Sequence, residues 1–361
     1  MLSGVRVVEI EGLGPGPFAA MMLADLGADV VVIHRPGKPD ALTSDPSLLD
    51  RGKRSILLDL KDAEDLAVAR ALIAGADMLI EGFRPGVMER LGLGPQACHE
   101  ENPALIYGRM TGWGQSGPRA RTAGHDFNYL ATAGALWYAS PPGQPPFPPP
   151  TMLGDVGGGA LYLVAGLLAG YIAAQRTGRG TVVDAAITDG AAHMMALMMA
   201  IRETGMMGDA RGAGLLDGPH WSRSYVCACG GFISVQAIEP KFYAELLDLL
   251  NLGGDDMMRD QHDRDQWPAQ SARMAGVFAR HPLEHWAGVF EGSDACAAPV
   301  LSPSQAASDP HNVARGTWGT DPLQPAPAPR FDGRVPEIAK PPNRGENGDA
   351  IRAELRARGL L

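Results

Sequence analysis

One histidine and two carboxylates fall within residues 124–159. His125 and Asp126 stand near its start, and Asp155 comes shortly before three glycines and a long apolar run. A carboxylate in that place is expected at the N-cap of a buried helix, close to helix N–H groups and to backbone that a ligand can approach. His125 follows a glycine in a segment without helix or strand periodicity, so we expect it on a loop.

A histidine and an aspartate that face one small molecule from opposite sides form a two-base proton-transfer site. That chemistry is the functional interpretation of His125 and Asp155. The competing interpretation is structural: Asp155 only caps its helix, and His125 only hydrogen-bonds loop backbone. These two residues by themselves do not decide between the interpretations, so the rest of the chain has to.

Composition narrows the possible classes of protein. A chain of 361 residues with a formal net charge of -10 predicts two domains and argues against nucleic-acid binding. Cys227 and Cys229 are spaced too closely for a usual zinc pair, and few cysteines in a long chain indicate the cytoplasm. The N-terminus does not resemble a signal peptide. The apolar run 160–174 is shorter than a membrane span and predicts a buried core helix, so we expect no membrane association.

The first half of the chain alternates strand and helix patterns, which predicts a parallel α/β sheet. Gly12 and Gly14 follow the first strand and begin a dinucleotide-binding motif, but its third glycine is replaced by Pro17. Arg35 stands where an NAD site would carry an acidic residue. A basic residue there suits a ligand with a phosphate on its ribose, such as NADP or coenzyme A, although a solvated loop also explains Arg35 alone. We expect strands at 5–10, 30–33, 78–81, 104–111 and 181–187, and helices at 18–26, 63–74, 85–91 and 159–175.

Further basic residues follow near successive strand ends, where parallel sheets bind their ligands. They are Lys38, Arg51, Lys53, Arg54, Lys61, Arg84 and Arg90. Arginine forks suit phosphate geometry, so the set predicts a small polyanion such as coenzyme A, with some of these side chains plain solvated surface.

The middle of the chain has another pattern. A methionine-rich helix capped by Asp189 is expected to run through Arg202 as core. A hairpin at 225–228 and 232–237, helices near 241–250, 267–279 and 283–290, and a strand at 297–301 then predict a smaller α+β domain. The proline-rich stretch 141–150 predicts a stiff loop, and the chain after 320 an extended tail that ends in a helix at 349–358.

Taken together, these passages resemble the class III coenzyme A-transferase superfamily and, within it, the racemases of α-methylacyl-CoA. The resemblance covers most of residues 5–320. It rests on the passages 7–18, 23–31, 51–55, 58–61, 84–91, 109–118, 123–129, 177–180, 237–243 and 293–301. It implies a Rossmann-like large domain with a parallel sheet (1–204 with 310–361), a smaller α+β domain (205–309) and an interlocked homodimer whose active sites lie between subunits.

The resemblance also implies roles for particular residues. His125 and Asp155 become the two catalytic bases, and Glu239 contacts the histidine. The implied coenzyme A contacts are Arg35, Leu58, Lys61, Arg84, Arg90, Gly124, Asp126 and Tyr129. The implied reaction interconverts (R)- and (S)-2-methylacyl-CoA thioesters through an enolate, without a metal or redox cofactor, since coenzyme A is part of the substrate.

The segment 217–225 departs from the racemase pattern and is one residue shorter, which leaves the acyl group open. Three alternatives to racemisation remain. A coenzyme A-transferase would use Asp155 as a nucleophile, although His125 beside Asp126 favours the racemase. A non-catalytic acyl-CoA-binding subunit would need none of the three polar groups. An NADP-dependent dehydrogenase is the weakest alternative because of Pro17.

Overall fold

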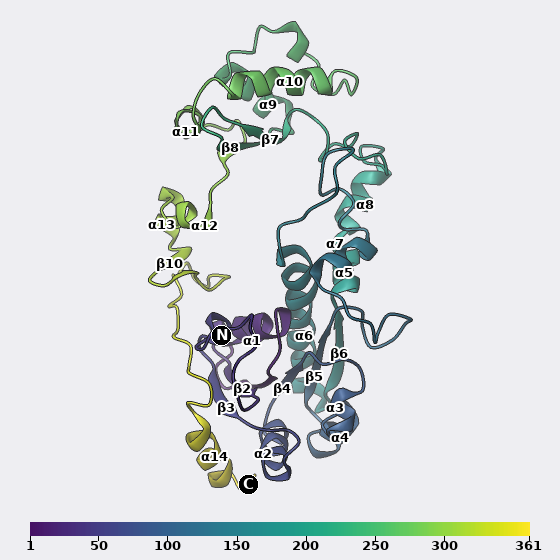
Figure 1. The fold of residues 1–361 in the computed structure, drawn as a ribbon, viewed down its shortest axis with the longest axis vertical. Coiled ribbons are helices and arrows are strands. Elements are labelled where there is room, and N and C mark those ends of the chain that lie inside the picture. The colour runs from purple at the N-terminus through teal and green to yellow at the C-terminus, as the bar shows by residue number, and fades with distance from the viewer. The chain divides into compact units, whose positions relative to one another are not determined.

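The structure, a computed structural model, describes residues 1–361 and divides into two compact units (Figure 1). The large unit comprises Met1–Leu136, Pro148–Met195 and Val313–Leu361, and the small unit comprises Trp137–Phe147 and Ala196–Asn312. The grouping of 137–147 with the small unit is not indicated by the sequence pattern. The domain boundaries proposed from the sequence stay a prediction.

The large unit is built on a six-stranded sheet in the order β3-β2-β1-β4-β5-β6, and every neighbouring pair in it is parallel. Its strands are β1 (Arg6–Ile10), β2 (Asp29–His34), β3 (Arg54–Leu57), β4 (Met78–Glu81), β5 (Ile106–Thr111) and β6 (Thr181–Ala186). The predicted parallel α/β sheet is therefore confirmed. The short edge strand β3 was not predicted. It has only four residues and begins with an arginine, so it shows no clear alternation of apolar and polar residues.

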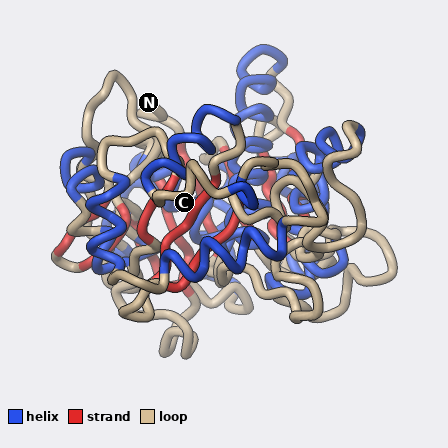
Figure 2. The backbone as a smooth tube through the Cα atoms, turned by 90° about the horizontal axis from the view of Figure 1, so that it is seen from above, coloured by secondary structure: helices blue, strands red, loops and turns tan.

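Helices cover both faces of this sheet, as the red strands and blue helices of Figure 2 show. Side chains alternate between the faces of a strand, so Val7 of β1 joins one core cluster and Val8 the other. The Val7 cluster includes α1 (Pro15–Asp25) and α6 (Leu161–Thr177), and the Val8 cluster includes α2 (Ala63–Ala74), α4 (Pro95–Glu101) and α14 (Gly348–Ala357). The remaining helical segments of this unit are η1 (Leu48–Asp50), α3 (Val87–Arg90), α5 (Asp126–Ala133), the π-helix η2 (Met152–Ala160) and α7 (Ile187–Met194).

The order of the strands places a switch point at β1. The chain runs from β1 outward to β2 and β3, and then returns to the other side of β1 with β4. Loops that follow the carboxyl ends of strands diverge at such a point and leave a crevice there. The turn 11–14 between β1 and α1 lies at this crevice, so the topology itself predicts where a ligand binds.

Several members of the predicted basic set are paired inside the chain. Lys53 is fully buried with its Nζ 2.5 Å from Glu9 Oε2 and 3.3 Å from Asp50 Oδ1. Burial raises the pKa of Glu9, and Lys53 opposes that rise. Arg51 forms a similar buried pair with Asp25 at 2.6 Å. The expectation that these cations bind a polyanion is wrong for Lys53 and Arg51, because each is buried and already paired with a carboxylate. Drawing either cation toward a ligand would leave that carboxylate as an unpaired buried charge.

The apolar helix is longer than expected. Met152–Thr177, which is η2 followed by α6, is long and apolar enough to cross a membrane by length and composition. It nevertheless packs on the sheet: a Cβ built on Gly108 of β5 would lie 2.9 Å from Leu163 and 3.0 Å from Leu167, and both leucines are fully buried. Core packing explains the composition of this face, so the helix is weak evidence for a membrane span.

The methionine-rich segment differs from expectation. It forms two helices, α7 and α8 (Ala196–Glu203), and Asp189 lies in the first turn of α7, whose N-cap is Ala186. No residue of α8 is buried, and Met199 is 41% exposed. The interpretation of this stripe as core is therefore wrong for α8 within one chain, whereas Met194 of α7 packs against η2, 3.4 Å from a Cβ built on Gly157.

The small unit combines a three-stranded antiparallel sheet with helices. Its strands β7 (Ser222–Val226), β8 (Phe232–Gln236) and β9 (Ala297–Pro299) confirm the predicted hairpin. Trp221, Phe278 and Trp286 are central to its core. Its other helical segments are α9 (Pro240–Leu249), η3 (Asp256–Met258), α10 (Trp267–Phe278), α11 (Leu283–Phe290) and α12 (Pro303–Ala306).

The chain after the small unit returns to the sheet. Helix α13 (Pro310–Arg315) crosses the boundary between the units, and a hairpin of β10 (Trp318–Thr320) and β11 (Leu323–Pro325) follows. Arg344 then pairs with Glu11, and Asn347 Oδ1 accepts the Ser55 N–H at 2.8 Å. These contacts hold the extended tail against β1 and β3 and deliver α14 to the core, where the helix expected at 349–358 is confirmed.

Candidate active site

Asp155 lies at the switch point, but not as an N-cap. The helical stretch begins at Met152 with Thr151 as N-cap, so Asp155 belongs to the first turn of η2. Its carboxylate faces the β1–α1 turn, since a Cβ built on Gly14 would lie 3.6 Å from Asp155 Oδ2. The expected cap is thus corrected, while the expected neighbourhood of a helix N-terminus and glycine backbone is found.

A hydrogen bond fixes Asp155 to the His125 segment. The Asp155 N–H donates to Asp126 Oδ1 at 2.7 Å, which joins η2 to α5. A Cβ on Gly154 would lie 2.3 Å from the same oxygen, so only glycine allows Asp126 to approach. Asp126, predicted to contact coenzyme A, is buried, and one of its carboxylate oxygens accepts the Asp155 N–H.

The environment of Asp155 tunes its acidity. Burial, and secondarily the negative charge of Asp126, raise the pKa of Asp155 to about 6, with His125 opposing the rise. A carboxyl with this pKa can both take and give a proton near neutral pH. His125 therefore lies close enough to Asp155 for its charge to affect the pKa of that carboxyl.

His125 is the N-cap of α5, and its backbone N–H donates to Asn128 Oδ1 at 3.1 Å. The side chain is exposed. Helix α5 was not predicted, because its eight residues carry little apolar periodicity and histidine is not a usual cap. His125, which was expected on a loop, therefore lies where a loop ends and helix α5 begins.

A cavity of about 230 Å³ contains His125 in its lining. It is also lined by Arg84, Trp113, Gly124 and Tyr129. The Tyr129 hydroxyl donates to the Gly124 carbonyl, and its ring meets Trp113 edge-on at 4.8 Å between centroids. Burial and the Asp155 charge raise the pKa of Tyr129, and Arg84 lowers it. The cavity thus brings one predicted base together with three predicted coenzyme A contacts.

Trp113 adds a group that the sequence analysis did not single out. Its indole Nε1 is buried without a hydrogen-bond partner and lies beside Gly124, where a built Cβ would be 3.1 Å from it. A buried donor without a partner is uncommon, and beside a cavity it marks a place where a partner is missing. The signal in the sequence was a tryptophan between the glycines of the loop that follows β5.

A second cavity, of about 460 Å³, lies beside the first at the ends of β1–β3. Arg35 and Lys61 are exposed at it, Leu58 is fully buried behind it, and Phe83 lines both cavities. Arg90 is exposed on α3 and lines neither cavity. Two cations over an apolar floor can bind a phosphorylated ligand that also has an apolar surface.

Glu239 belongs to the small unit, where it is the exposed N-cap of α9. It lies near Cys296, whose thiol pKa is raised by burial and by the Glu239 charge. Its role toward His125 stays a prediction. In the segment 217–225, His220 and Trp221 are fully buried in the core of the small unit, and Nε2 of His220 lies 2.7 Å from the Tyr243 hydroxyl.

Backbone donors at the start of η2 are fewer than expected. The N–H of Asp155 is taken by Asp126 and that of Val156 by the Thr151 carbonyl. The following glycines instead allow close packing, since a Cβ on Gly158 would lie 2.8 Å from the backbone nitrogen of Ala191 in α7. The N–H groups of Leu153 and Gly154 have no acceptor in the chain. No group of three or more His, Cys, Asp or Glu side chains could hold a metal ion.

Comparisons with known proteins place this architecture in a known family. The sequence profile of CoA-transferase family III matches residues 2–347. The α-methylacyl-CoA racemase of Mus musculus is 41% identical over 354 residues, which cover 96% of this chain and 91% of the relative. The Homo sapiens α-methylacyl-CoA racemase is 41% identical over 98% of this chain and 93% of the relative.

More distant relatives carry another activity in their names. Acetyl-CoA:oxalate CoA-transferase of Acetobacter aceti is 29% identical over 98% of this chain and 95% of its own. A crystal structure of a CAIB/BAIF family protein from Brucella suis superposes with a TM-score of 0.84, at 27% identity, over 98% of this chain and 99% of that one. The chain belongs to CoA-transferase family III.

The contact between Asp126 and Asp155 makes a prediction about titration. Asp126→Asn keeps an oxygen acceptor for the Asp155 N–H but removes the like charge, so the pKa of Asp155 should fall from about 6 toward its ordinary 3.8. Carbon-detected NMR titration of the carboxyl measures this, with the exposed Asp349→Asn as control. An unchanged pKa in Asp126→Asn would contradict the proposed coupling.

The same shift fixes the sign of a stability effect. The folded chain holds this proton more tightly than the unfolded chain, so the contribution of Asp155 to the free energy of unfolding falls as pH rises from 3.8 to about 6. Asp126→Asn should reduce that fall.

Proposed function

We propose that this enzyme is an isomerase that interconverts (R)- and (S)-2-methylacyl-CoA thioesters. The observation that carries the proposal is the placement of His125 and Asp155 on two linked helix starts at one crevice of the sheet. It is supported by 41% identity to the mouse and human α-methylacyl-CoA racemases over nearly the whole chain. The segment 217–225 leaves the particular acyl group open.

The reaction is two proton transfers at one carbon. One base removes the α-proton of the thioester, and the other group returns a proton to the opposite face of the enolate. Asp155, with a pKa of about 6, is suited to either task, and His125 supplies the other. The two residues exchange roles between the two directions of the reaction.

The enolate oxygen needs hydrogen-bond donors, since charge accumulates on it in the transition state. The free N–H groups of Leu153 and Gly154 are suited to this task because they lie at the N-terminal end of η2, beside Asp155. Glu239 would fix the tautomer and orientation of His125 from the small unit of a second chain.

Coenzyme A would occupy the two neighbouring cavities. Arg35 and Lys61 at the larger cavity are assigned to the phosphates, with Leu58 behind the adenosine portion, and Arg84, Gly124 and Tyr129 to the part nearer the thioester. Arg90 is assigned a less direct role, as an exposed cation outside both cavities. Asp126 is assigned the role of positioning Asp155. No metal or redox cofactor is part of the proposal.

The chain is proposed to work as an interlocked homodimer in the cytoplasm. Apolar side chains on both units remain exposed in one chain, among them Ile172 at 55% and Leu197 at 70%. A subunit contact would cover such side chains. It would also account for α8, none of whose residues is buried within its own chain.

A coenzyme A-transferase is the second candidate. Its carboxylate would attack the thioester and pass through a mixed anhydride to an Asp155–coenzyme A thioester. The relationship to acetyl-CoA:oxalate CoA-transferase favours it, and His125 beside Asp155 favours the racemase. A non-catalytic acyl-CoA-binding subunit would show neither activity.

Acyl-CoA binding is tested by calorimetric titration with an acyl-CoA and, separately, with NADPH. Lys61→Gln and Arg84→Gln should each weaken acyl-CoA binding about tenfold, because each removes a charge-assisted contact. Arg280→Gln, an exposed change on the small unit, is the control. Tight NADPH binding without acyl-CoA binding would refute the ligand assignment.

The proposed homodimer predicts a mass of twice 38.1 kDa in light scattering at micromolar concentration. Leu197→Glu should shift the protein toward the monomer, because a charge would be buried in an apolar contact. A fully active monomer of the unmodified chain would exclude a site shared between subunits.

The chemistry is tested in deuterium oxide with one enantiomer of a 2-methylacyl-CoA. A racemase should exchange the α-proton for deuterium while it inverts the centre, as followed by mass spectrometry. His125→Ala and Asp155→Ala should slow inversion about 100-fold or more while binding weakens far less. His285→Ala is the control for the loss of a histidine.

The same experiment separates the rival functions. Transfer of coenzyme A to an added carboxylic acid, without deuterium uptake, would identify a transferase. If neither exchange nor transfer occurs with any acyl-CoA, the non-catalytic acyl-CoA-binding subunit is the remaining alternative. In the direction that begins with Asp155 as base, the rate should fall below about pH 6, since protonation removes the base.

A further inference from the structure

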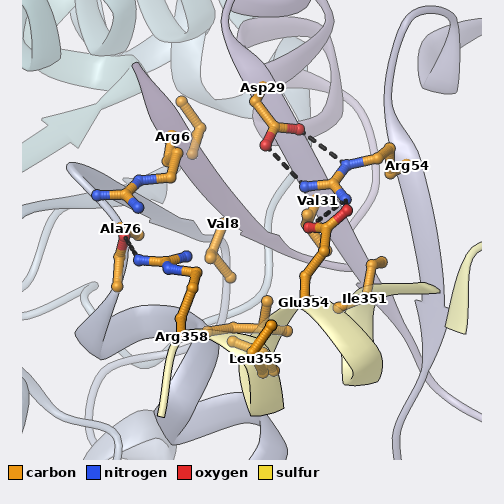
Figure 3. A pocket seen from close by; sticks show the side chains of 14 residues that line it. Arg6, Val8, Asp29, Val31, Arg54, Ala76, Ile351, Glu354, Leu355 and Arg358 are labelled. Atoms are coloured by element: carbon orange, nitrogen blue, oxygen red, sulfur yellow. Dashed lines mark hydrogen bonds and ion pairs between the residues drawn. The ribbon is translucent and has the colours of Figure 1, made fainter. Parts of the chain in front are cut away.

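A separate cavity, of about 400 Å³, lies near the amino-terminal ends of β1–β3 (Figure 3). Arg6, Asp29 and Arg54 are the first residues of these strands, and all three line it. The candidate active site lies at the carboxyl ends of the same sheet. At roughly 3.3 Å per residue, strands of this length keep the two sites about 15 Å apart.

The floor of this cavity is apolar. Its side chains belong to the core cluster between the sheet, α2 and α14, and they are 9% exposed or less. They are Val8, Val31, Leu72, Ala76, Ile351 and Leu355. An apolar portion of a ligand in the cavity would therefore meet the outer edge of this packed core.

The cations at its rim differ in their partners. Arg54 is neutralised twice, by Asp29 at 2.7 Å and by Glu354 at 2.8 Å. Arg6 and Arg358 form no ion pair. Arg358 makes one long hydrogen bond of 3.4 Å to the Gly75 carbonyl, and Asp77 accepts the backbone N–H of Arg6 rather than its guanidinium.

Both unpaired arginines belong to the Ala76 side of the cavity, since Arg358 bonds to the Gly75 carbonyl and the Arg6 backbone to Asp77, while Arg54 with its two carboxylates lies on the other side (Figure 3). The lining carries three arginines against two carboxylates, an excess of positive charge in a protein whose net charge is -10. Two like charges at one rim repel one another unless an anion lies between them. The guanidinium groups of Arg6 and Arg358, neither of which forms an ion pair with Asp77 or another carboxylate, are thus the donors that this rim offers to an anionic group.

We propose that this cavity binds a carboxylic acid with an apolar chain, of the kind of a medium-chain fatty acid. The carboxylate lies between Arg6 and Arg358, which suit its planar geometry, and the chain lies on Val8, Ala76 and Leu355. A nucleotide would find neither an aromatic platform nor polar donors on this floor. The site is distinct from the acyl-CoA site and does not depend on the proposed reaction.

Such a ligand would connect three segments that are distant in sequence. Arg6 begins β1, Ala76 precedes β4, and Arg358 and Leu355 belong to the end of the chain. Binding would therefore stabilise the docking of α14 on the sheet, by the usual linkage between ligand affinity for the folded state and its stability.

The experiment uses octanoate labelled with ¹³C at its carboxyl, titrated into the full-length protein and followed by NMR. Binding should persist when a saturating acyl-CoA occupies the other cavities. Arg6→Gln and Arg358→Gln should each weaken it about tenfold, because each removes a charge-assisted hydrogen bond. Arg280→Gln should leave it unchanged, and 1-octanol should bind more weakly than octanoate.

Ala357→Trp provides a second variant, because Ala357 lines the cavity and is exposed, so a large side chain can close the entrance without disturbing the core. It should abolish octanoate binding and leave the thermal stability and the racemase activity of the unliganded protein as they are. Binding that is lost with saturating acyl-CoA and insensitive to Arg6→Gln and Arg358→Gln would overturn the proposal. Equal affinity for inorganic phosphate would also overturn it, since the apolar floor would then have no part in recognition.

Discussion

The contact on which the site depends is the one between the Asp126 carboxylate and the backbone of η2. The Asp155 N–H reaches Asp126 Oδ1 at 2.7 Å only because Gly154 has no side chain to block it. One hydrogen bond therefore sets the distance between two helix starts, one of which presents His125 and the other Asp155. It also places a second negative charge beside Asp155, which is part of why the pKa of Asp155 lies near the range in which proton transfer is useful.

Charge serves two purposes in this chain, and burial separates them. Lys53 and Arg51 lie within the fold, each 5% exposed or less and paired with a carboxylate, and they connect the strand ends to the surrounding loops. Arg35, Lys61 and Arg84 come from the same region of sequence but remain exposed at the cavities. The buried cations are thus neutralised within the fold, and the exposed cations at the cavities, which form no ion pair, remain to bind an anionic ligand.

Much of the fold could be predicted from the sequence because its signals are local. The β-branched runs of β1 and β2 and the apolar face of α2 are examples. The edge strand β3 and helix α5 escaped because neither has enough apolar residues to show a period. The pairing of Lys53 with Glu9 escaped for another reason: it joins residues 44 positions apart, and no pattern in either segment reveals the partner.

The site residues show the same division. His125 and Asp155 were found through residue type, neighbouring glycines and family resemblance. Trp113 was not, because an unpaired indole N–H is a property of its surroundings. The position of Asp155 within its helix was also predicted wrongly, since a sequence carries no sign that the first nine residues of a helical run form a π-helix.

That π-helix has a consequence for how changes of length would act here. A π-turn holds about one residue more than an α-turn, so deletion of one glycine from 157–159 could be absorbed by a return to α-helical winding. Because the wider turn supplies the missing residue, the segment before the deletion would keep its place, and Asp155 would stay at the Gly14 turn. A deletion within α6 has no such reserve: everything before it would turn by about 100° around the axis, and Asp155 would leave the Gly14 turn. In an alignment, a single-residue gap at 157–159 would therefore be a tolerated variation, whereas one inside α6 would signal a change of chemistry.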